Sequence, residues 1–450
     1  MESEQPTSAS ASFPTLVFES GEAFARARDA VDPLADFRSR FELPGAGPQG
    51  EDRVYLLGNS LGPLPRGARA EIAAELDAWA ARGVESYFEP PRRWYEADER
   101  YRPAMAEVVG AHPDEVALAG SLTTNLHLLF ASFYRPEGGR ARILVEADAF
   151  PSDRYLVETQ LAWHGIDPRE GMIEVGRDDG TSTERPTAEG IEAILSERGD
   201  EIALVFLGGV NYLTGEALDV ARITRAAHAA GCTVGFDLAH AAGNVPLRLH
   251  DDGADFAAWC SYKYLNSGPG SVAGLFVHRR HASDAEIPRL GGWWGVDPDT
   301  RFRMAAGAPF TPRSDAAGWQ LSCPPILAMA PLGPALAMFE EAGMAALREK
   351  SVRLTGYLEW LLAEADDPER APSAALTRLT PAEPERRGAQ LSYRVPEARA
   401  VRDALSERGV DVDLRDPDVL RLAPCPLFNR YLDVYRAAHA LLEILEEGVS

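Results

Sequence analysis

Short apolar runs alternate with amphipathic segments between about residues 51 and 280. Four runs rich in β-branched or apolar residues, each bounded by Gly, Pro or Asp, predict buried strands at 141–147, 201–207, 232–238 and 271–278. Two segments between them carry apolar residues at i, i+3 and i+4 and end in glycine, which predicts helices at 187–199 and 218–231. This alternation indicates an α/β fold whose mostly parallel sheet lies between helices.

The C-terminal third has a different pattern. Residues 324–365 predict long helices, with a break or kink at Pro331 and Pro334. Two short strands (390–395 and 419–424) then flank a helix at 398–409, which predicts a smaller α+β lobe. Because 450 residues exceed what one core usually supports, we expect an N-terminal arm and two domains, at 1–50, 51–325 and 326–450.

Charge and cysteine content narrow the function classes. A formal charge of −24 opposes binding to nucleic acid or to an anionic membrane, which both need a basic surface. The four cysteines are scattered and show neither metal-ligand spacing nor a disulfide framework, so we expect a reducing, cytoplasmic location and no metal. The N-terminus lacks the pattern of a signal peptide, and no apolar run approaches the roughly 20 residues of a membrane helix.

Lysine is almost absent, which limits any amine chemistry to two residues. Of the 45 basic residues 43 are arginines, and the two lysines are Lys263 and Lys350. Lys350 lies in a segment that we interpret as an exposed helix (LREKSVRL). Lys263 follows an apolar run, FAAWCSYKY, and precedes the glycine-rich NSGPGS at 266–271. Lys263 is therefore the candidate amine.

The predicted strand ends carry a set of residues that suits one cofactor. In open α/β sheets, ligands bind at the carboxyl ends of the strands. Pyridoxal phosphate needs an amine for a Schiff base, an acid at the pyridine nitrogen, a phosphate cradle and a flat partner for its ring. We assign the amine to Lys263 and the acid to Asp237. The candidates for the phosphate and its surroundings are Thr123, Asp153 and Tyr262, and the ring-packing candidates are Phe150 and His240.

Each of these residues also has an ordinary structural interpretation. A lone lysine is usually a solvated surface group, an aspartate at a strand end is often a helix cap, and a single histidine is more often structural. Their order favours the functional interpretation. Asp-x-x-His, followed about two dozen residues later by Tyr-Lys and a glycine-rich turn, is more specific than any single member.

The motifs resemble those of kynureninase, a fold-type I pyridoxal-phosphate enzyme of the class V aminotransferase-like group. The matching stretches run in family order from about residue 55 and comprise LLGNSLGPLP (56–65), SLTTNLHLL (121–129), FPSDRYLVETQ (150–160), GVNYLTGE (209–216), GFDLAHAAGNV (235–245), WCSYKYLNSGPGSVAG (259–274), GGWWG (291–295), WQLSCPPIL (319–327) and LRLAPCPLFN (420–429).

The resemblance implies hydrolysis of L-kynurenine, or of its 3-hydroxy derivative, to an anthranilate and L-alanine in tryptophan catabolism. Lys263 would then move the proton at the substrate's Cα, Tyr262 would donate a proton on the alanine side, and Arg421 would bind the substrate carboxylate. The cofactor-contacting positions would be Leu122, Thr123, Phe150, Pro151, Ser152, Asp153, Asp237, His240, Tyr262, Lys263, Trp293 and Cys323. Trp293 and the Cys323 region would reach the cofactor of the other subunit, which implies a homodimer with shared active sites.

Departures from the family leave other functions open. Cys323, Gly208, Val84 and Val296 stand where relatives often carry polar residues or histidines, so the substrate could be a substituted kynurenine or another γ-keto amino acid. A desulfurase-like or aminotransferase-like activity on the same fold is the alternative, with Cys323 as the candidate nucleophile. A non-catalytic binding protein is a third class, which the intact Lys263 opposes.

Overall fold

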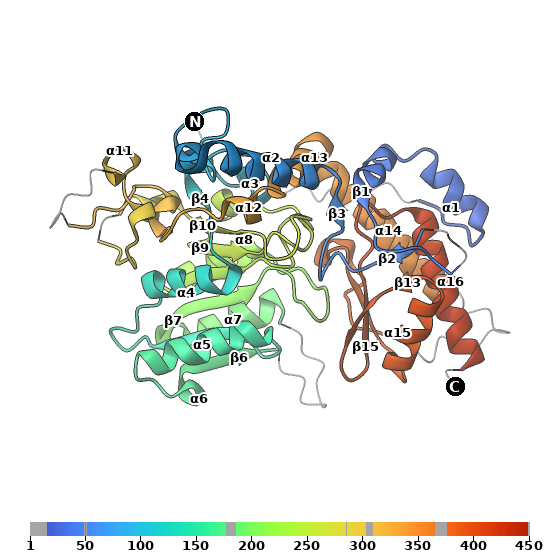
Figure 1. Ribbon diagram of the computed structural model, residues 1–450. Coiled ribbons are helices and arrows are strands. Elements are labelled where there is room, and N and C mark those ends of the chain that lie inside the picture. Colours follow the sequence, from blue (N-terminus) through green and yellow to red (C-terminus); the bar gives the residue numbers. More distant parts are fainter. Residues whose placement is uncertain are drawn as a thin grey trace, which may run out of the picture.

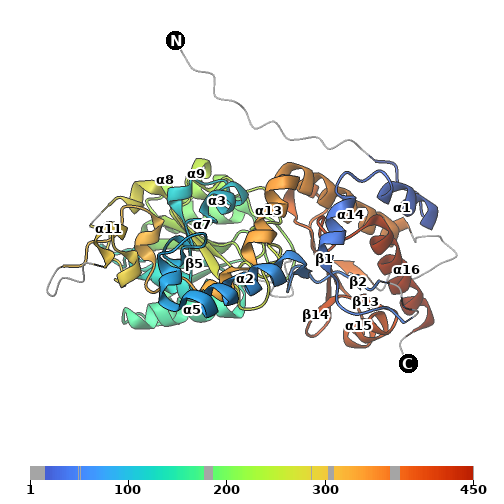
Figure 2. The ribbon, with the colours of Figure 1, turned by 45° about the horizontal axis from the view of Figure 1, so that its top comes forward.

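The chain folds into two lobes that lie side by side (Figure 1). The computed structural model describes residues 16–48, 50, 52–176, 186–284, 286–302, 309–364 and 376–448. The larger lobe holds a seven-stranded sheet and the smaller one a four-stranded sheet. Figure 2 shows the same two bodies from a second direction. In the described residues, no helix is long and apolar enough to cross a membrane.

The large sheet is mostly parallel, as predicted. Its strand order is β4 (Val116–Ala119), β10 (Ala273–Val277), β9 (Phe256–Trp259), β8 (Thr233–Asp237), β7 (Ile202–Gly208), β5 (Arg142–Glu146) and β6 (Met172–Val175). Strand β10 runs antiparallel to both of its neighbours, and the other pairs are parallel. The α/β class and the four predicted strands are confirmed, whereas the short strands β4 and β6 were not foreseen.

Alternate side chains of each strand enter two separate cores. In β7, Val205 and Leu207 join one buried cluster, and Leu204 and Phe206 join the other. The first cluster is covered by α3 (Arg102–Val109), α7 (Ala188–Arg198) and α8 (Val220–Ala229), and the second by α4 (Leu122–Phe133) and α5 (Pro151–Trp163). A strand buried on both faces reads as a continuous apolar run, which explains its signal in the sequence.

The small lobe has an antiparallel sheet backed by helices. Its order is β11 (Thr377–Arg378), β12 (Leu391–Arg394), β15 (Val419–Leu422) and β14 (Asp413–Arg415). Its core is shared with α14 (Met344–Glu364), α15 (Ala398–Glu407) and α16 (Tyr431–Glu447). The remaining main elements are β1 (Phe41–Glu42), β3 (Leu64–Pro65), α2 (Gly67–Arg82), α6 (Pro168–Gly171), α9 (Leu249–Asp252), α10 (Arg279–Ala282), α11 (Pro298–Arg301), α12 (Ile326–Met329) and α13 (Leu332–Ala342).

The N-terminal segment packs on the small lobe. Helix α1 (Glu22–Asp29) contacts α16, and β2 (Val54–Tyr55) pairs in parallel with β13 (Val410–Asp411). Val54 and Leu56 belong to the core of the small lobe, although they lie beyond the predicted arm. The domain limits at residues 50 and 325 stay predictions.

The helical region 324–365 breaks where one proline and one glycine require it. Pro331 precedes α13, and Pro334 lies in the first turn of that helix, where its missing N–H costs nothing. The second break is at Gly343, whose φ of 73° lies in the left-handed region that glycine adopts most easily.

The interpretation of Lys350 as a surface residue is wrong. Its ammonium is buried in α14 and lies 2.6 Å from Asp32 Oδ2. The apolar neighbours that looked like one face of an exposed helix instead pack into the small lobe, and a charge buried there needs a partner. Because Lys350 is engaged away from the strand ends, Lys263 remains the candidate amine.

Candidate active site

A cavity of about 350 Å³ opens at the carboxyl ends of β5, β7 and β8. That volume falls in the range of about 300–1,000 Å³ that is typical of small-molecule sites. Ten lining residues come from the strand ends and the segment after β9, namely Val145, Glu146, Phe206, Leu207, Gly208, Asp237, Ala239, His240, Tyr262 and Lys263. Others come from α4, α5 and the small lobe. The cavity therefore lies where the two lobes meet.

Lys263 projects its amine into this cavity from the turn that follows β9. Its Nζ lies 3.0 Å from His240 Nε2 and 5.9 Å from the centre of the Phe150 ring. The predicted amine, histidine and aromatic ring are thus brought together by three separate segments. The amine faces a cavity wall that includes aromatic side chains, as a group that must react with a carbonyl requires.

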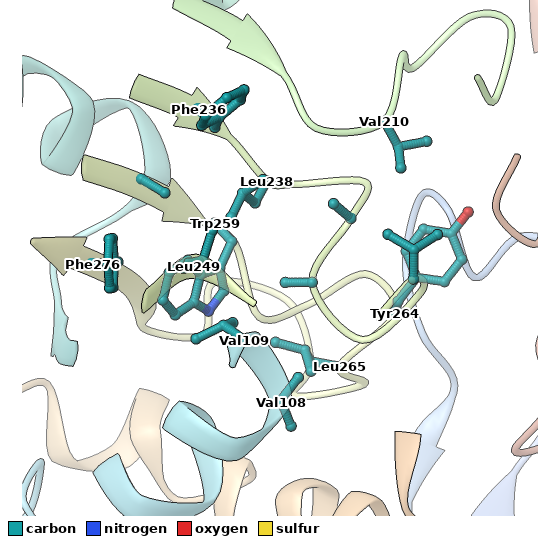
Figure 3. Close-up of a cluster of buried hydrophobic side chains, with 14 of the residues drawn as sticks. Val108, Val109, Val210, Phe236, Leu238, Leu249, Trp259, Tyr264, Leu265 and Phe276 are labelled. Atoms are coloured by element: carbon teal, nitrogen blue, oxygen red, sulfur yellow. The ribbon is translucent and has the colours of Figure 1, made fainter. Parts of the chain in front are cut away.

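The turn that carries Lys263 is held from two sides. Tyr264 and Leu265, the next two residues, are buried in the hydrophobic cluster of Figure 3, which also includes Phe236 and Leu238. On the other side the Gly62 N–H donates to the Tyr262 carbonyl over 2.8 Å. A Cβ atom at Gly62 would lie 2.6 Å from the Lys263 carbonyl oxygen, so only glycine permits this approach.

Two acids meet at the end of β8. Asp237 accepts the Ala239 N–H at Oδ1 over 2.7 Å, and its carboxyl is hydrogen-bonded to that of Asp153. Burial, with the neighbouring Asp237 charge, raises the pKa of Asp153 well above its usual value. Asp153 therefore keeps its proton and donates it to Asp237, because two buried carboxylates in contact cannot both ionise.

Glu146 is a third buried acid in the cavity wall. It accepts the Gly208 N–H over 2.7 Å and the Asn211 side-chain amide over 2.6 Å. Burial raises its pKa to about 7. The nearby Asp237 charge adds to this rise, whereas the hydrogen bonds from Asn211 and Gly208 oppose it. Asn211 Oδ1 in turn accepts the backbone N–H groups of Leu213 and Thr214, so Glu146 fixes the loop after β7.

His240 is neutral in this environment. Burial and the positive charge of Lys263 hold its pKa well below the usual value. Its Nε2 therefore accepts from the Lys263 ammonium, and its Nδ1 carries the proton but has no partner among the described residues. A buried, unpartnered N–H beside the cavity is a group that a bound ligand would satisfy.

The N-termini of α4 and α5 meet at the cavity. The hydroxyls of Thr123 and Ser152 lie 2.9 Å apart, and Leu122 lines the wall beside them. Each helix presents unpaired N–H groups at this end, so the pair forms a cradle for an anion such as a phosphate. Pro151 occupies the first turn of α5, where it shapes the helix start without lining the cavity.

Tyr262 lines the cavity directly before Lys263 in the chain. Burial and the neighbouring Cys260 raise the pKa of its hydroxyl. The hydroxyl is therefore protonated at neutral pH and is available as a proton donor.

Besides Pro151, three predicted residues lie outside the cavity wall of this chain: Trp293, Cys323 and Arg421. Trp293 is 40% exposed, and Cys323 is paired with Tyr87. Arg421 is fully buried and is bound to Asp413 and to the carbonyl oxygen of Tyr212.

Several lining residues were not predicted, among them Asn59, Ser60, Glu146, Asn211, Tyr212 and Arg415. Glu146 ends a predicted strand, as Asp237 does, and that position was a signal in the sequence. Arg415 is one of 43 arginines and its sequence context gives no such signal.

Curated relatives place the chain in a family. It is 50% identical over 426 residues to the kynureninase of Myxococcus xanthus, which covers 94% of this chain and 97% of the relative. It is 52% identical over 417 residues to the kynureninase of Xanthomonas euvesicatoria, covering 92% and 96%. The chain belongs to the kynureninase family. The family profile described as "Kynureninase C-terminal domain" matches residues 347–441, which contain the small sheet.

Solved structures agree on the fold of this kynureninase-family chain. One is a C-DES mutant with glycine covalently linked to its PLP cofactor, with a TM-score of 0.72 at 20% identity over 90% of this chain and 98% of the other. Another is the cysteine desulfurase CsdA from Escherichia coli, with a TM-score of 0.72 at 19% identity over 93% and 99%. At this identity the likeness supports a fold-type I architecture and carries no activity.

Proposed function

We propose that this chain hydrolyses the Cβ–Cγ bond of L-kynurenine, or of a ring-substituted kynurenine, to an anthranilate and L-alanine, with pyridoxal phosphate as cofactor. The single observation that carries the proposal is the Lys263 amine, which projects into a cavity that Asp237 and His240 also line. Membership of the kynureninase family supports this choice of substrate and reaction.

The residues of the cavity fit the cofactor. Lys263 supplies the amine for its aldehyde, Asp237 an acceptor for the protonated ring nitrogen, and Thr123 with Ser152 the phosphate cradle. The unpartnered His240 Nδ1–H and the Phe150 ring offer contacts for the cofactor ring. When bound, pyridoxal phosphate supplies an electron sink for negative charge at the substrate carbon beside the amino group.

The protein's own groups move the protons. Lys263 would take the proton at Cα of the substrate, and neutral His240 accepts a hydrogen bond from the lysine without adding a competing charge. Burial raises the pKa of Asp237, whereas the Ala239 N–H, the Lys263 charge and the hydrogen bond from Asp153 oppose that rise and favour its carboxylate form. Tyr262 stays protonated and donates to the carbon that leaves as alanine.

The same proposal includes a homodimer with shared active sites. Trp79, Val84 and Leu327 are exposed apolar side chains around a second hollow of about 630 Å³, formed by α2 and residues 324–328. A patch of this kind is typical of an interaction surface. Trp293 and Cys323 lie outside the cavity of their own chain, which suits positions that complete a neighbour's site. The four free thiols suit a reducing, cytoplasmic location.

The preference for a ring-substituted substrate rests on the wall of the cavity. Gly208 lines it without a side chain, and a Cβ there would lie 3.0 Å from Glu146 Oε1. At this one position the wall offers no side-chain hydrogen bond to a polar ring substituent, so it gives no advantage to a particular hydroxylated ring. A desulfurase is disfavoured because the relatives that match this chain at 50% and 52% identity over most of its length are kynureninases.

The test is an assay of the purified protein with kynurenine and its 3-hydroxy and ring-methylated analogues, followed by anthranilate fluorescence and alanine release. We expect cleavage of at least one of them, and an absorbance band near 420 nm that Lys263→Ala abolishes. Highest kcat/KM on unmodified L-kynurenine would remove the preference for a substituted ring. No cleavage of any analogue by coloured, cofactor-loaded protein would refute the proposed reaction.

A further inference from the structure

Three charged side chains share one face of the small sheet. Asp413 and Arg415 are two residues apart in β14, so their side chains point the same way. Arg421 in β15 pairs directly with Asp413 across the two strands, which puts it on that face as well. This face is turned toward the loop that carries Tyr212, at the rim of the cavity.

The N–H donors of Arg421 are hydrogen-bonded to other groups of the protein. Its Nε lies 2.5 Å from Asp413 Oδ2, one Nη is also bound to that oxygen, and the other Nη donates to the Tyr212 carbonyl over 2.5 Å. Its side chain is fully buried and is absent from the cavity wall. In this arrangement Arg421 fixes the Tyr212 loop, and two of its nitrogens already bind the Asp413 carboxylate.

Arg415, in contrast, lines the cavity and keeps its fork open. Its side chain is 38% exposed, and its Nε lies 3.3 Å from Asp413 Oδ2. Within the described part of the chain neither of its Nη groups has a hydrogen-bond partner. The other guanidinium of the cavity wall, Arg154, is already paired with Glu158 and Glu174 at 3.0 and 2.6 Å.

The charges around Asp413 leave one positive charge unbalanced. A single carboxylate lies between two guanidiniums, so the trio carries a net charge of +1 at neutral pH. Arg421 takes the shorter contacts to Asp413, and the unbalanced charge is therefore presented by Arg415 to the cavity. An incoming carboxylate would restore neutrality and accept two parallel N–H bonds from the open fork.

We propose that Arg415 binds the α-carboxylate of the amino-acid substrate, as a contact in addition to the one expected from Arg421. This inference rests on the proposed function for the identity of the substrate as an amino acid. Asp413 is then a positioning residue, because it holds both guanidiniums without touching the substrate.

The test compares two ligands that differ only in a carboxylate. Cofactor-loaded protein is titrated with L-alanine and with ethylamine, and binding is followed by the change in cofactor absorbance. We expect Arg415→Gln to weaken the binding of L-alanine about tenfold or more and to leave ethylamine within about twofold, since only the carboxylate loses a charge-assisted contact. Arg415→Lys, which keeps the charge, should recover part of the loss.

Arg399→Gln is the matched control. Arg399 is an exposed arginine of the same lobe, paired with Asp416 next to β14, and its loss should leave both ligands unaffected. Equal weakening of L-alanine and ethylamine by Arg415→Gln would overturn the proposal, because the effect would then be structural. Weaker binding of pyridoxal phosphate itself would also overturn it, since the anion at Arg415 would be the cofactor's phosphate.

The proposed reaction and the proposed carboxylate site can be refuted independently of each other. Wild-type protein that does not cleave any kynurenine, but prefers L-alanine to ethylamine through Arg415, would refute the reaction and keep the carboxylate site. Wild-type protein that cleaves kynurenine with no loss of carboxylate preference in Arg415→Gln would keep the reaction and refute the site.

Discussion

At the scale of single residues, Asp153 and Asp237 look alike in the sequence but have different roles in the cavity. Asp153 keeps a proton and donates it, whereas Asp237 is the acceptor. Asp153→Asn retains a donor of the same shape, so we expect a loss in kcat of about tenfold at most. Asp237→Asn removes the carboxylate that we propose to face the cofactor ring, and we expect a loss of about 100-fold or more. Steady-state kinetics of the two purified, cofactor-loaded variants would measure both effects.

The outcome that contradicts this assignment is a reversed order of the two losses. Asp153→Leu serves as the control for Asp153, because it removes the hydrogen-bond donor that Asp153→Asn retains. It should lose more activity than Asp153→Asn if donation to Asp237 is what matters.

Glu146 gives a second prediction at this scale, on stability. Its pKa is about 7 when folded and close to 4.5 when unfolded, so the folded state binds the extra proton between these values. The contribution of Glu146 to the free energy of unfolding is thus present below about pH 4.5 and falls as pH rises through 7, by about 3 kcal/mol in total. Glu146→Gln does not titrate. In cofactor-free protein, the stability of the wild type relative to the variant should fall between pH 5 and 7.5, measured by urea unfolding.

A flat difference across that pH range would show that Glu146 is ionised throughout. Glu158→Gln is the control, because Glu158 lies on the solvent side of α5 and is paired with Arg154 outside the sheet core. Its difference curve should show no step near pH 7.

At the scale of elements, the close approach of the 58–62 loop to the Lys263 turn is the feature most sensitive to a single methyl group. Gly62→Ala puts a Cβ 2.3 Å from Asn266 Oδ1 and 2.6 Å from the Lys263 carbonyl oxygen, so backbone must move. We expect a loss of about 1–3 kcal/mol in the free energy of unfolding, together with a shifted cofactor absorbance band, since the lysine turn is displaced. Denaturant unfolding and absorbance spectra would measure the two effects.

Gly21→Ala is the matched control for that prediction. No atom lies within 4 Å of a Cβ at Gly21, and its φ of −83° suits any residue. Equal stability of Gly62→Ala and Gly21→Ala would contradict the close approach.

The elements also define how far sequence reasoning reaches. Hydrophobic pattern predicted the strands β5, β7, β8 and β10, because each is buried on both faces and reads as an unbroken apolar run. Order along the chain predicted Asp237, His240 and Lys263, since neighbouring strands end at the same edge. The pattern failed for Lys350, because a residue buried by a neighbouring segment far away in sequence carries no local sign of its burial.

Contacts between segments that are far apart in the chain could not be predicted from the sequence either. His112, Glu115 and His250 lie at the edge of the sheet opposite the cavity, with ligand atoms within 4.8 Å of one another, although no metal-ligand spacing exists in the sequence. Glu115 there accepts the backbone N–H groups of His112 and Arg279 and bonds to His250, so it ties three segments together. The role of Arg415 depends in the same way on which partner Arg421 has already taken. Such facts follow from tertiary packing alone.

At the scale of the whole molecule, the shared site of the proposed homodimer can be tested with dimers whose two chains carry different inactivating substitutions. If Trp293 completes the neighbour's cavity, a dimer of one Lys263→Ala chain and one Trp293→Ala chain has one site with both defects and one site with none. Co-expressed chains that pair at random should then recover about one quarter of wild-type activity, although each variant alone is nearly inactive. Two affinity tags would isolate the mixed dimer, and its kcat per dimer would be measured.

Lys263→Ala with Asp237→Asn is the control, because both residues line the same cavity of one chain, so every site of the mixed dimer carries a defect. Recovery in the control, or none in the Trp293 pair, would contradict shared sites and assign Trp293 to packing within its own subunit.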